Sequence, residues 1–428
     1  MAARPRLLFL AQALPYPPHS GVANRTFNIL RQLQLAYDID LVAFARVSHQ
    51  PDRAAREAAW RALQDVATVV AEPTPIPHEH SALRKLWDHL RSVLSGRAYT
   101  HYVYESDAFR DRLHDVLRRR RPDLVHLDSL DLARWLPALP PVPTACTHHD
   151  IDFELLRQRA ERTRSTVLRR YLRFQADRVE RLVREVCPRL ALNVMMSELD
   201  ARRLRALAPH ATTVVVPNGT DTEYFQPGRE SVAGRVVFVG PTYNHPNWDA
   251  VEFLLQDIWP KVHTADRSTS LRLIGRSAPS DQARYNAEPG VTTLGYVTDV
   301  RPPLSEARCC VVPIRIGGGT RLKILDAWAM GQAVVSTAIG AEGLAARDGD
   351  NILVRDTPEA FAAAVLQVLS DARLRARLGE HARRTAVEHY SWSVIGRRIC
   401  SAYDGLLGRP AVPAARLARA ADAIPRRA

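Results

Sequence analysis

Glycines followed at once by basic residues make residues 311–331 the part of the sequence best suited to chemistry. Gly317, Gly318 and Gly319 come directly after an apolar stretch. Glycines lack side chains, so the backbone N–H groups of such a loop can approach a ligand closely. The apolar spacing that follows predicts a helix that opens with Thr320 as N-cap and closes at Gly331. The free N–H groups and the dipole of a helix start favour an anion.

Three side chains at the start of this predicted helix complete the candidate site. Arg321 and Lys323 add full positive charges, and Asp326 is placed one turn further on, where a carboxylate accepts hydrogen bonds from sugar hydroxyls. The stretch therefore predicts a site for a phosphate-linked sugar or nucleotide. The alternative is an ordinary solvated helix start. A Walker loop is excluded, because the glycines are not followed by Gly-Lys-Ser/Thr.

Polar residues also follow predicted strands in the first half of the chain. His149 comes after a strand at 143–147, and open α/β sheets bind ligands at the carboxyl ends of their strands. His148 is expected to point to the opposite side. His126 and Asp128 close another strand, where contact with an acceptor and ordinary loop polarity remain equal alternatives. Gly21 lies between a strand and a helix, which is again favourable for phosphate.

Two series of alternating strands and helices must position these residues. The first predicts strands at 6–11, 39–44, 66–71, 123–128, 143–147, 191–195 and 212–216, and helices at 22–35, 51–63, 81–95, 105–120 and 153–187. A turn-rich break at 217–228 separates it from the second series. This predicts strands at 236–239, 270–274, 291–294, 309–313, 333–336 and 352–354, and helices at 247–263, 299–307, 320–330, 358–369, 372–387 and 390–407. The alternation predicts an α/β fold with two doubly wound parallel sheets, and 428 residues suit two domains.

The net charge of +13 permits two interpretations. A basic surface attracts nucleic acid or anionic membranes, whereas an arginine bias can also reflect the base composition of a genome. We predict no nucleic-acid partner, because no aromatic platforms interleave with the basic residues. The odd number of cysteines, five, and their lack of metal-ligand spacing predict reduced core residues, no metal site and a cytoplasmic location. The N-terminal apolar stretch is predicted to be a strand rather than a signal peptide.

Four stretches together resemble the family 4 group of GT-B-fold, retaining glycosyltransferases, most closely those associated with exopolysaccharide export. They are residues 17–21, the segment 149–154, the passage formed by 197–200 with 216–225, and the glycine stretch with its continuation to Gly343. The resemblance covers about residues 6–408. It implies two Rossmann-like domains that face a central cleft, with boundaries at 1–216 and 217–389. A helix at about 390–408 completes the first domain, and 409–428 is predicted to be a disordered tail.

The resemblance assigns roles to the candidate residues. It implies a donor diphosphate site at Gly21, Gly317–Gly319, Thr320, Arg321 and Lys323, a ribose or sugar site at Asp326 and Glu342, and a catalytic contact at His149. No cofactor or metal is implied beyond a nucleotide-diphosphate sugar as donor substrate. The implied acceptor is a saccharide or a polyprenyl-linked molecule. Anionic lipid at the inner membrane is a candidate partner, through the arginine-bearing face of 157–184.

The sequence departs from the family pattern at one point. Members usually carry two glutamates eight positions apart, whereas this chain has Gly318 and Asp326. The departure leaves two alternatives to a glycosyltransferase: a nucleotide-sugar epimerase on the same fold, and a non-catalytic nucleotide-binding assembly protein.

Overall fold

The computed structural model describes residues 4–228, 231–317 and 319–410. The chain forms two compact units. Unit 1 contains Met1–Pro217 and Ile395–Ala428, and unit 2 contains Asn218–Val394. The sequence predicts boundaries after residues 216 and 389, so the structural divisions fall one and a few residues later. The predicted tail lies almost entirely outside the described residues.

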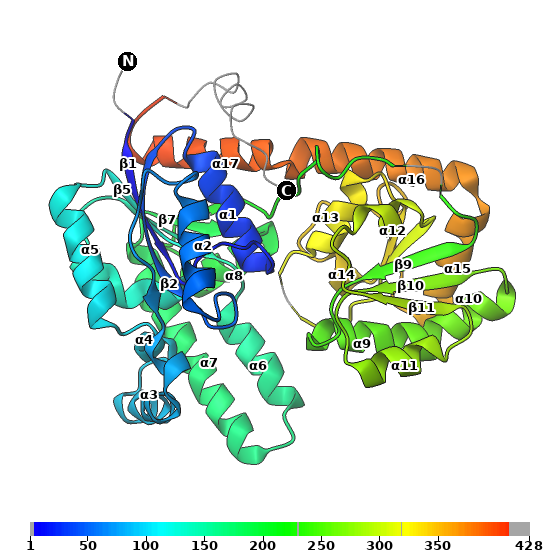
Figure 1. The fold of residues 1–428 in the computed structure, drawn as a ribbon, viewed down its shortest axis with the longest axis horizontal. Coiled ribbons are helices and arrows are strands. Elements are labelled where there is room, and N and C mark those ends of the chain that lie inside the picture. Colours follow the sequence, from blue (N-terminus) through cyan, green and yellow to red (C-terminus); the bar gives the residue numbers. More distant parts are fainter. Residues whose placement is uncertain (1–3, 229–230, 318, 411–428) are drawn as a thin grey trace. The chain divides into compact units, whose positions relative to one another are not determined.

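Unit 1 is built on a parallel sheet, shown in blue to green in Figure 1. Its strand order is β3-β2-β1-β5-β6-β7-β8, with β4 paired to β2. The strands are β1 (Arg6–Ala11), β2 (Asp38–Ala45), β3 (Val69–Val70), β4 (Thr74–Pro75), β5 (Leu124–Leu127), β6 (Thr144–His148), β7 (Leu192–Met195) and β8 (Thr213–Val215). The central strands are buried almost throughout, which is why they read as continuous apolar runs.

The helices of unit 1 follow the predicted alternation. They are α1 (Gly21–Leu33), α2 (Arg53–Leu63), α3 (Ala82–Ser95), α4 (Thr100–Val103), α5 (Asp107–Arg119), α6 (Asp152–Arg162), α7 (Thr166–Val186), α8 (Glu198–Leu207) and α17 (Trp392–Leu406). Most of α17 belongs to unit 1. Its Tyr403 hydroxyl lies 2.5 Å from His126 Nδ1, and its Asp404 accepts a hydrogen bond from Tyr37 at 2.9 Å. The last helix thus packs on the first unit, as the family resemblance implies.

Unit 2 is also built on a parallel sheet, in the order β11-β10-β9-β12-β13-β14. The strands are β9 (Arg235–Val239), β10 (Ser270–Ile274), β11 (Val291–Gly295), β12 (Cys309–Val312), β13 (Val334–Ser336) and β14 (Leu353–Val354). The helices are α9 (His245–Phe253), α10 (Trp259–Ala265), α11 (Pro279–Asn286), α12 (Arg301–Ser305), α13 (Leu322–Ala329), α14 (Ala338–Ala341), α15 (Pro358–Ser370) and α16 (Ala372–Thr385). The prediction of two doubly wound parallel sheets is confirmed.

The structure corrects several predicted helices. The single helical region at 153–187 is two helices, α6 and α7. The break comes where Thr163 turns to extended backbone and the Ser165 side chain caps α7 by accepting from the Leu168 N–H. The helix predicted at 247–263 contains a π-helical turn at Leu254–Ile258, next to Pro260, which cannot donate a backbone hydrogen bond. The short polar helix α11 was not predicted, because it lacks a clear apolar stripe.

Apolar side chains fill both units, and all five cysteines are buried and free, as predicted. No helix in the described part of the chain is long and apolar enough to cross a membrane.

Candidate functional site

The glycine stretch lies at the point of the unit 2 sheet where ligands usually bind. The strand order reverses between β9 and β12, and open α/β sheets bind ligands beyond the carboxyl ends of the strands at this reversal. Residues 313–321 leave β12 there and lead into α13, while Gly240 leaves β9 and leads toward α9. The structure thus adds a second loop, at Gly240, to the one that the sequence predicted.

Lys323 in the first turn of α13 is the most unusual group of this region. Its Nζ donates a 2.7 Å hydrogen bond to Asn247 Oδ1 and lies 4.4 Å from the centre of the Phe238 ring. The pKa of Lys323 is lowered to about 7, mainly by burial; Cys310 opposes this shift and the nearby Arg321 adds to it. Among the described residues, no carboxylate forms an ion pair with Lys323. A cation in this position gains most from an incoming anion.

Gly240 leaves the room that Lys323 occupies. A Cβ atom at position 240 would lie 2.6 Å from Lys323 Nζ and 2.9 Å from Asn247 Oδ1. Any side chain at this position would displace the amine or the amide. Gly240 and Asn247 were not predicted as site residues, because they lie far from the glycine stretch in the sequence.

The glycine loop itself is held by its own arginine. Gly317 has φ +101°, and its carbonyl accepts a 2.8 Å hydrogen bond from Arg321 Nη2. Gly319 also has a positive φ, +76°, which explains glycine at this position. Gly318 lies outside the described residues.

The prediction that Thr320 caps the helix is wrong. α13 begins at Leu322 with Arg321 at the N-cap, and no side chain caps it. The Thr320 Oγ1 atom is buried and has no hydrogen-bond partner within the described ranges. The N–H groups of the first turn of α13 are therefore not used by a capping side chain.

Asp326 lies one turn after Lys323, and its Oδ1 accepts a 2.8 Å hydrogen bond from Thr220 Oγ1. The pKa of Asp326 is raised to about 7, mainly by burial; the hydrogen bond from Thr220 opposes this shift and the neighbouring Asp221 adds to it. Thr220 belongs to the predicted break between the two series and was missed as a partner. In this structure, Asp326 fixes that segment to α13 and remains partly exposed.

Glu342 is the half-buried C-cap residue of the short helix α14. The N-cap of this helix, Thr337, donates a hydrogen bond to the carbonyl of Ile314. α14 is thereby attached to the chain segment that leads into the glycine loop. Glu342 therefore lies on a helix at the same edge of the unit 2 sheet as the glycine loop.

The remaining predicted residues, His149 and Gly21, belong to unit 1. His149 follows β6, and its Nε2 lies 3.4 Å from Asp128 Oδ1 at the end of β5. Both carboxylate oxygens of Asp128 accept hydrogen bonds from Thr26 Oγ1 on α1, at 2.9 and 3.0 Å. Three elements therefore position His149. The order of the unit 1 sheet reverses between β1 and β5, so this chain of contacts also lies at a reversal.

The other two histidines of these strands are core residues. His148 points away from His149, as predicted, and its Nε2 lies 2.9 Å from Asn193 Oδ1. His126 is fully buried between Tyr403 and Thr147. Burial lowers the pKa of His148 to about 4 and that of His126 to about 3, so both are neutral at pH 7. Contact between His126 and an acceptor is excluded by its burial.

Gly21 is the first residue of α1, after the N-cap Ser20, which accepts a 3.2 Å hydrogen bond from the Ala23 N–H. The first turn of α1 carries no acidic residue. Further along the same helix, the buried Arg25 donates hydrogen bonds to the carbonyls of Val216 and Pro217, at 2.7 and 2.8 Å. Burial lowers the pKa of Arg25 to about 10. Arg25, which the sequence did not single out, fixes the end of unit 1 to α1.

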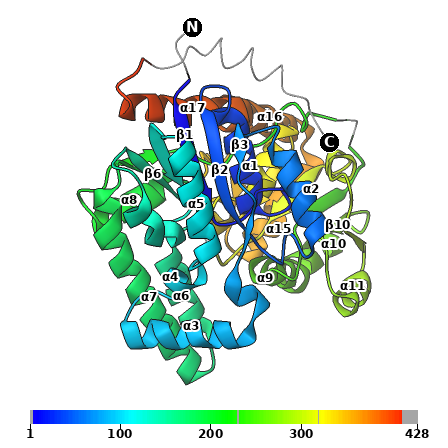
Figure 2. The same cartoon turned by 60° about the vertical axis from the view of Figure 1, so that its left-hand side comes forward.

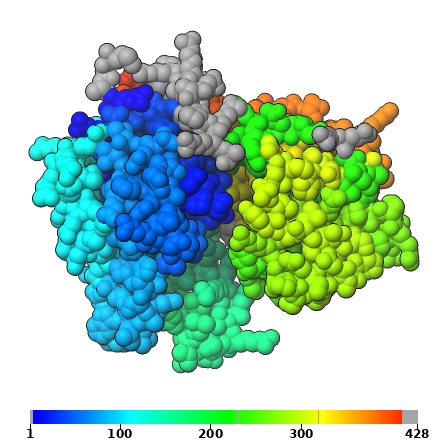
Figure 3. Space-filling model, viewed as in Figure 1, coloured from blue at the N-terminus to red at the C-terminus, as the bar shows by residue number. Residues whose placement is uncertain are grey.

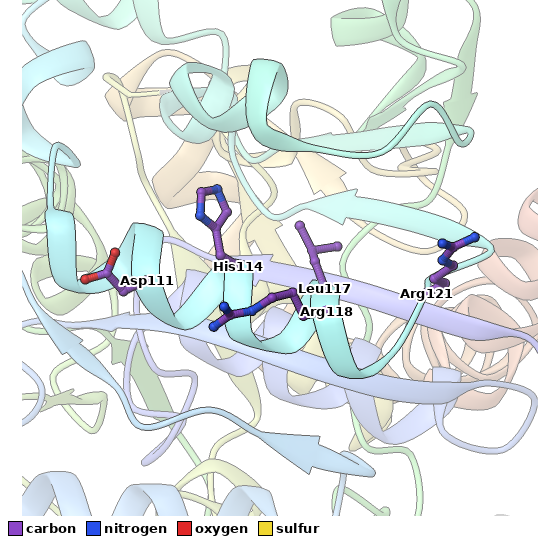
Figure 4. A pocket seen from close by; sticks show the side chains of 5 residues that line it. All are labelled: Asp111, His114, Leu117, Arg118 and Arg121. Carbon is purple, nitrogen blue, oxygen red and sulfur yellow. The ribbon is translucent and has the colours of Figure 1, made fainter.

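Two surface hollows lie away from all these residues. One of about 690 Å³ lies beside α5 and is lined by Asp111, His114, Leu117, Arg118 and Arg121 (Figure 4). Another, of about 320 Å³, lies in unit 2 around the ion pair of His381 with Asp350. Within the described ranges, no group of three or more metal-ligating side chains is placed to hold a metal ion.

Two family models match the chain. Glycosyltransferase Family 4 matches residues 19–224, and Glycosyl transferases group 1 matches residues 233–371. Between them they cover most of the chain, one on each unit.

Curated relatives carry similar descriptions. The chain is 24% identical over 284 residues to an MMP α-(1→4)-mannosyltransferase of Mycolicibacterium hassiacum, which covers 62% of this chain and 66% of the relative. It is 28% identical over 228 residues to a phosphatidyl-myo-inositol mannosyltransferase of Mycolicibacterium smegmatis, with 50% and 57% covered. The chain thus spans less than two thirds of the length of these relatives.

Solved structures share the fold. Sucrose-phosphate synthase of Thermosynechococcus elongatus matches with a TM-score of 0.66 and 16% identity, over 94% of this chain and 99% of the other. Anabaena HepE in complex with UDP matches with a TM-score of 0.65 and 14% identity, over 94% and 100%.

Proposed function

We propose, since this chain belongs to the family 4 glycosyltransferases and has their GT-B fold, that it moves a sugar from a nucleotide-diphosphate sugar to a saccharide or lipid-linked acceptor. The observation that carries this proposal is Lys323. It is a largely enclosed amine without an ion-pair partner in the described residues, at the strand reversal of the unit 2 sheet and beside a glycine loop. A bound diphosphate would supply the missing anion.

The chemistry of the transfer explains why these groups are needed. The bond between the sugar and the diphosphate breaks through a state with positive charge on the sugar and negative charge on the leaving group. We assign stabilisation of the leaving group to Lys323, Arg321 and the backbone amides of the glycine loop and the α13 start. The two side-chain charges contribute more than the helix dipole, which adds about 0.3–1 kcal/mol. The proposed reaction retains the anomeric configuration and needs no metal.

Unit 1 contributes the second half of the proposed chemistry. We assign to His149 a contact with the donor sugar, and this contact strengthens as positive charge grows on the sugar. Asp128 supports this role, because its Oδ1 atom lies 3.4 Å from Nε2 and helps to fix the position of the imidazole ring. Thr26 in turn fixes the carboxylate. The proposed role of Gly21 is to let the start of α1 approach a phosphate.

The wider context is proposed from the relatives. Two of them are described as mannosyltransferases, and a glycosyltransferase of lipopolysaccharide core biosynthesis is also similar over a short stretch. HepE has been solved with UDP-glucose. We propose a role in exopolysaccharide or cell-surface glycan synthesis, in the cytoplasm and peripherally at the inner membrane. Asp326 and Glu342 are the proposed contacts to the ribose and the sugar.

A panel of UDP-, GDP- and ADP-sugars, scored by thermal stabilisation, tests the donor assignment. Sugars linked to one of the three nucleotides are expected to raise the melting temperature of the protein. The nucleoside diphosphate with that base should bind far more tightly than the corresponding nucleoside. In calorimetry, Lys323→Ala and Arg321→Ala should lower the affinity for the nucleoside diphosphate more than the affinity for the nucleoside, since the lost contacts are to phosphate. Lys261→Ala is the matched control, because Lys261 pairs with Glu359 on the surface of unit 2. Equal losses for both ligands would reject the phosphate assignment.

A further inference from the structure

The helix α3 has the reverse of the usual burial pattern. Its large apolar side chains lie on the outside, with exposed fractions between 46% and 81%: Leu83, Leu86, Trp87, Leu90, Val93 and Leu94. At 100° per residue these positions form a single stripe along the helix. An apolar stripe of this kind ordinarily faces the core, and here it faces solvent.

The inner face of α3 is polar and well fixed. Asp88 and Ser92 are completely buried. Asp88 accepts a 2.8 Å hydrogen bond from Arg84, and Ser92 accepts one of the same length from Gln175 on α7. His89 Nδ1 lies 2.5 Å from the Tyr171 hydroxyl, also on α7. Because polar contacts hold this face inward, the outward direction of the apolar stripe is a built feature of the fold.

The turn between α6 and α7 adds to the same surface. Val167 and Leu168 begin α7 with exposed fractions of 80% and 41%. They lie about one turn before Tyr171, the residue that contacts α3. Figures 1 and 2 both show α3 and the α6–α7 turn at the same end of unit 1, and Figure 3 shows that both are open to solvent. Residues 82–95 and 164–170 are called the α3 surface below.

Charge decides which partner fits the α3 surface. Arg164 and Arg170 are exposed beside Val167 and Leu168, and no described carboxylate forms an ion pair with either arginine. The acidic side chain of α3, Asp88, is buried and paired with Arg84. An apolar ridge with a tryptophan and free cations at its edge suits a bilayer that contains anionic headgroups.

Other arginines of α6 and α7 are less available to anionic headgroups. The guanidinium of Arg157 on α6 pairs with Glu180 and Asp177, and Arg184 also pairs with Glu180. Arg169 donates to the carbonyl of Thr163. The predicted arginine face of 157–184 is thus partly neutralised by the protein itself.

We propose that the α3 surface is where this protein enters an anionic lipid bilayer, with the apolar stripe of α3 among the acyl chains and Arg164 and Arg170 at the headgroups. The proposal rests on the proposed function for its location at a membrane. It differs from the predicted arginine face in assigning the main contact to apolar side chains of α3.

The test is flotation with vesicles of phosphatidylcholine, with and without phosphatidylglycerol, in the absence of donor and acceptor. The full chain should float with the vesicles that contain phosphatidylglycerol, and less so as salt rises. The double variant Leu86→Glu/Leu90→Glu should lose at least tenfold in vesicle affinity. Arg170→Ala should lose about fivefold in vesicle affinity, the effect of one cation at an anionic surface.

A matched variant controls for charge and folding. Val232→Glu/Val387→Glu adds the same two charges at exposed positions of unit 2 and should float like the wild type. Thermal stabilisation by the nucleotide, measured on every variant, keeps the two proposals distinguishable: Leu86→Glu/Leu90→Glu should retain it while vesicle binding is lost. Equal flotation of both double variants would overturn the proposal. So would a wild-type dimer that the α3 variant dissociates, because the α3 surface would then bind a second copy of the chain.

Discussion

Because of Lys323, the affinity for the nucleotide is expected to depend on pH. The pKa of Lys323 lies at about 7, because burial disfavours its charge. If a bound diphosphate holds Lys323 protonated, each binding event at pH 8 takes up about 0.9 proton, and at pH 7 about 0.5. The dissociation constant should then rise about fivefold from pH 7 to pH 8, which equals about 1 kcal/mol. The terminal phosphate changes little in this window, since with a second pKa of about 6 it is already about 90% doubly ionised at pH 7.

Calorimetry in buffers of different ionisation enthalpy measures this uptake directly. The wild type and Lys261→Met should show it, and Lys323→Met should lack it. Asp326 also titrates near pH 7, so the difference between the wild type and Lys323→Met is the quantity to compare. Proton uptake in Lys323→Met equal to that of the wild type would refute the assignment of the diphosphate to Lys323.

The same pKa predicts the stability of the variant. Lys323 is largely neutral in the folded state above pH 7 and charged in the unfolded state up to about pH 10.4. The unfolded state therefore binds more protons between these values, and the contribution of Lys323 to stability rises with pH in this window. Lys323→Met should melt at a higher temperature than the wild type at pH 7, and this difference should shrink toward pH 10. A lower melting temperature for Lys323→Met at pH 7 would contradict the lowered pKa.

Three further predictions follow from single contacts. Gly240→Ala should weaken binding of the diphosphate at least tenfold, because its Cβ would displace Lys323, and calorimetry with the nucleoside should show little loss. His149→Ala should lower turnover about 100-fold with donor affinity nearly unchanged, whereas unaltered turnover would remove it from the site. Tyr403→Phe should lower the free energy of unfolding by about 1 kcal/mol, since it removes a buried hydrogen bond to His126, and denaturant unfolding measures this.

The fold was predictable because its signals are local. Strands buried on both faces must be continuously apolar, and a serine before a helix accepts a hydrogen bond from the N–H group three residues on, as Ser197 does. The glycine stretch was also local, since loop, charges and helix follow one another. The alternation of elements placed it after a predicted strand, and its position at the strand reversal came from the strand order of the sheet.

The partners of the site residues were not predictable, because they depend on distant parts of the chain. Asn247 lies 76 residues from Lys323, and Thr220 lies 106 residues from Asp326. No periodicity records such pairings. The outward orientation of the apolar stripe of α3 was not predicted, for a related reason. An apolar stripe shows that a helix has two different faces, but the contacts of the buried Asp88 and Ser92 decide which face turns inward.

The proposed reaction breaks the bond between a sugar and a nucleoside diphosphate and transfers the sugar to an acceptor. The most direct measurement incubates the donor selected by the nucleotide panel, labelled in its sugar, with the protein and bacterial lipid and saccharide extracts. We expect label in an acceptor, in equal amount to the nucleoside diphosphate released, for the wild type and Lys261→Ala but not for Lys323→Ala. An intact donor with every extract, or a donor whose sugar has only changed its configuration, would contradict it.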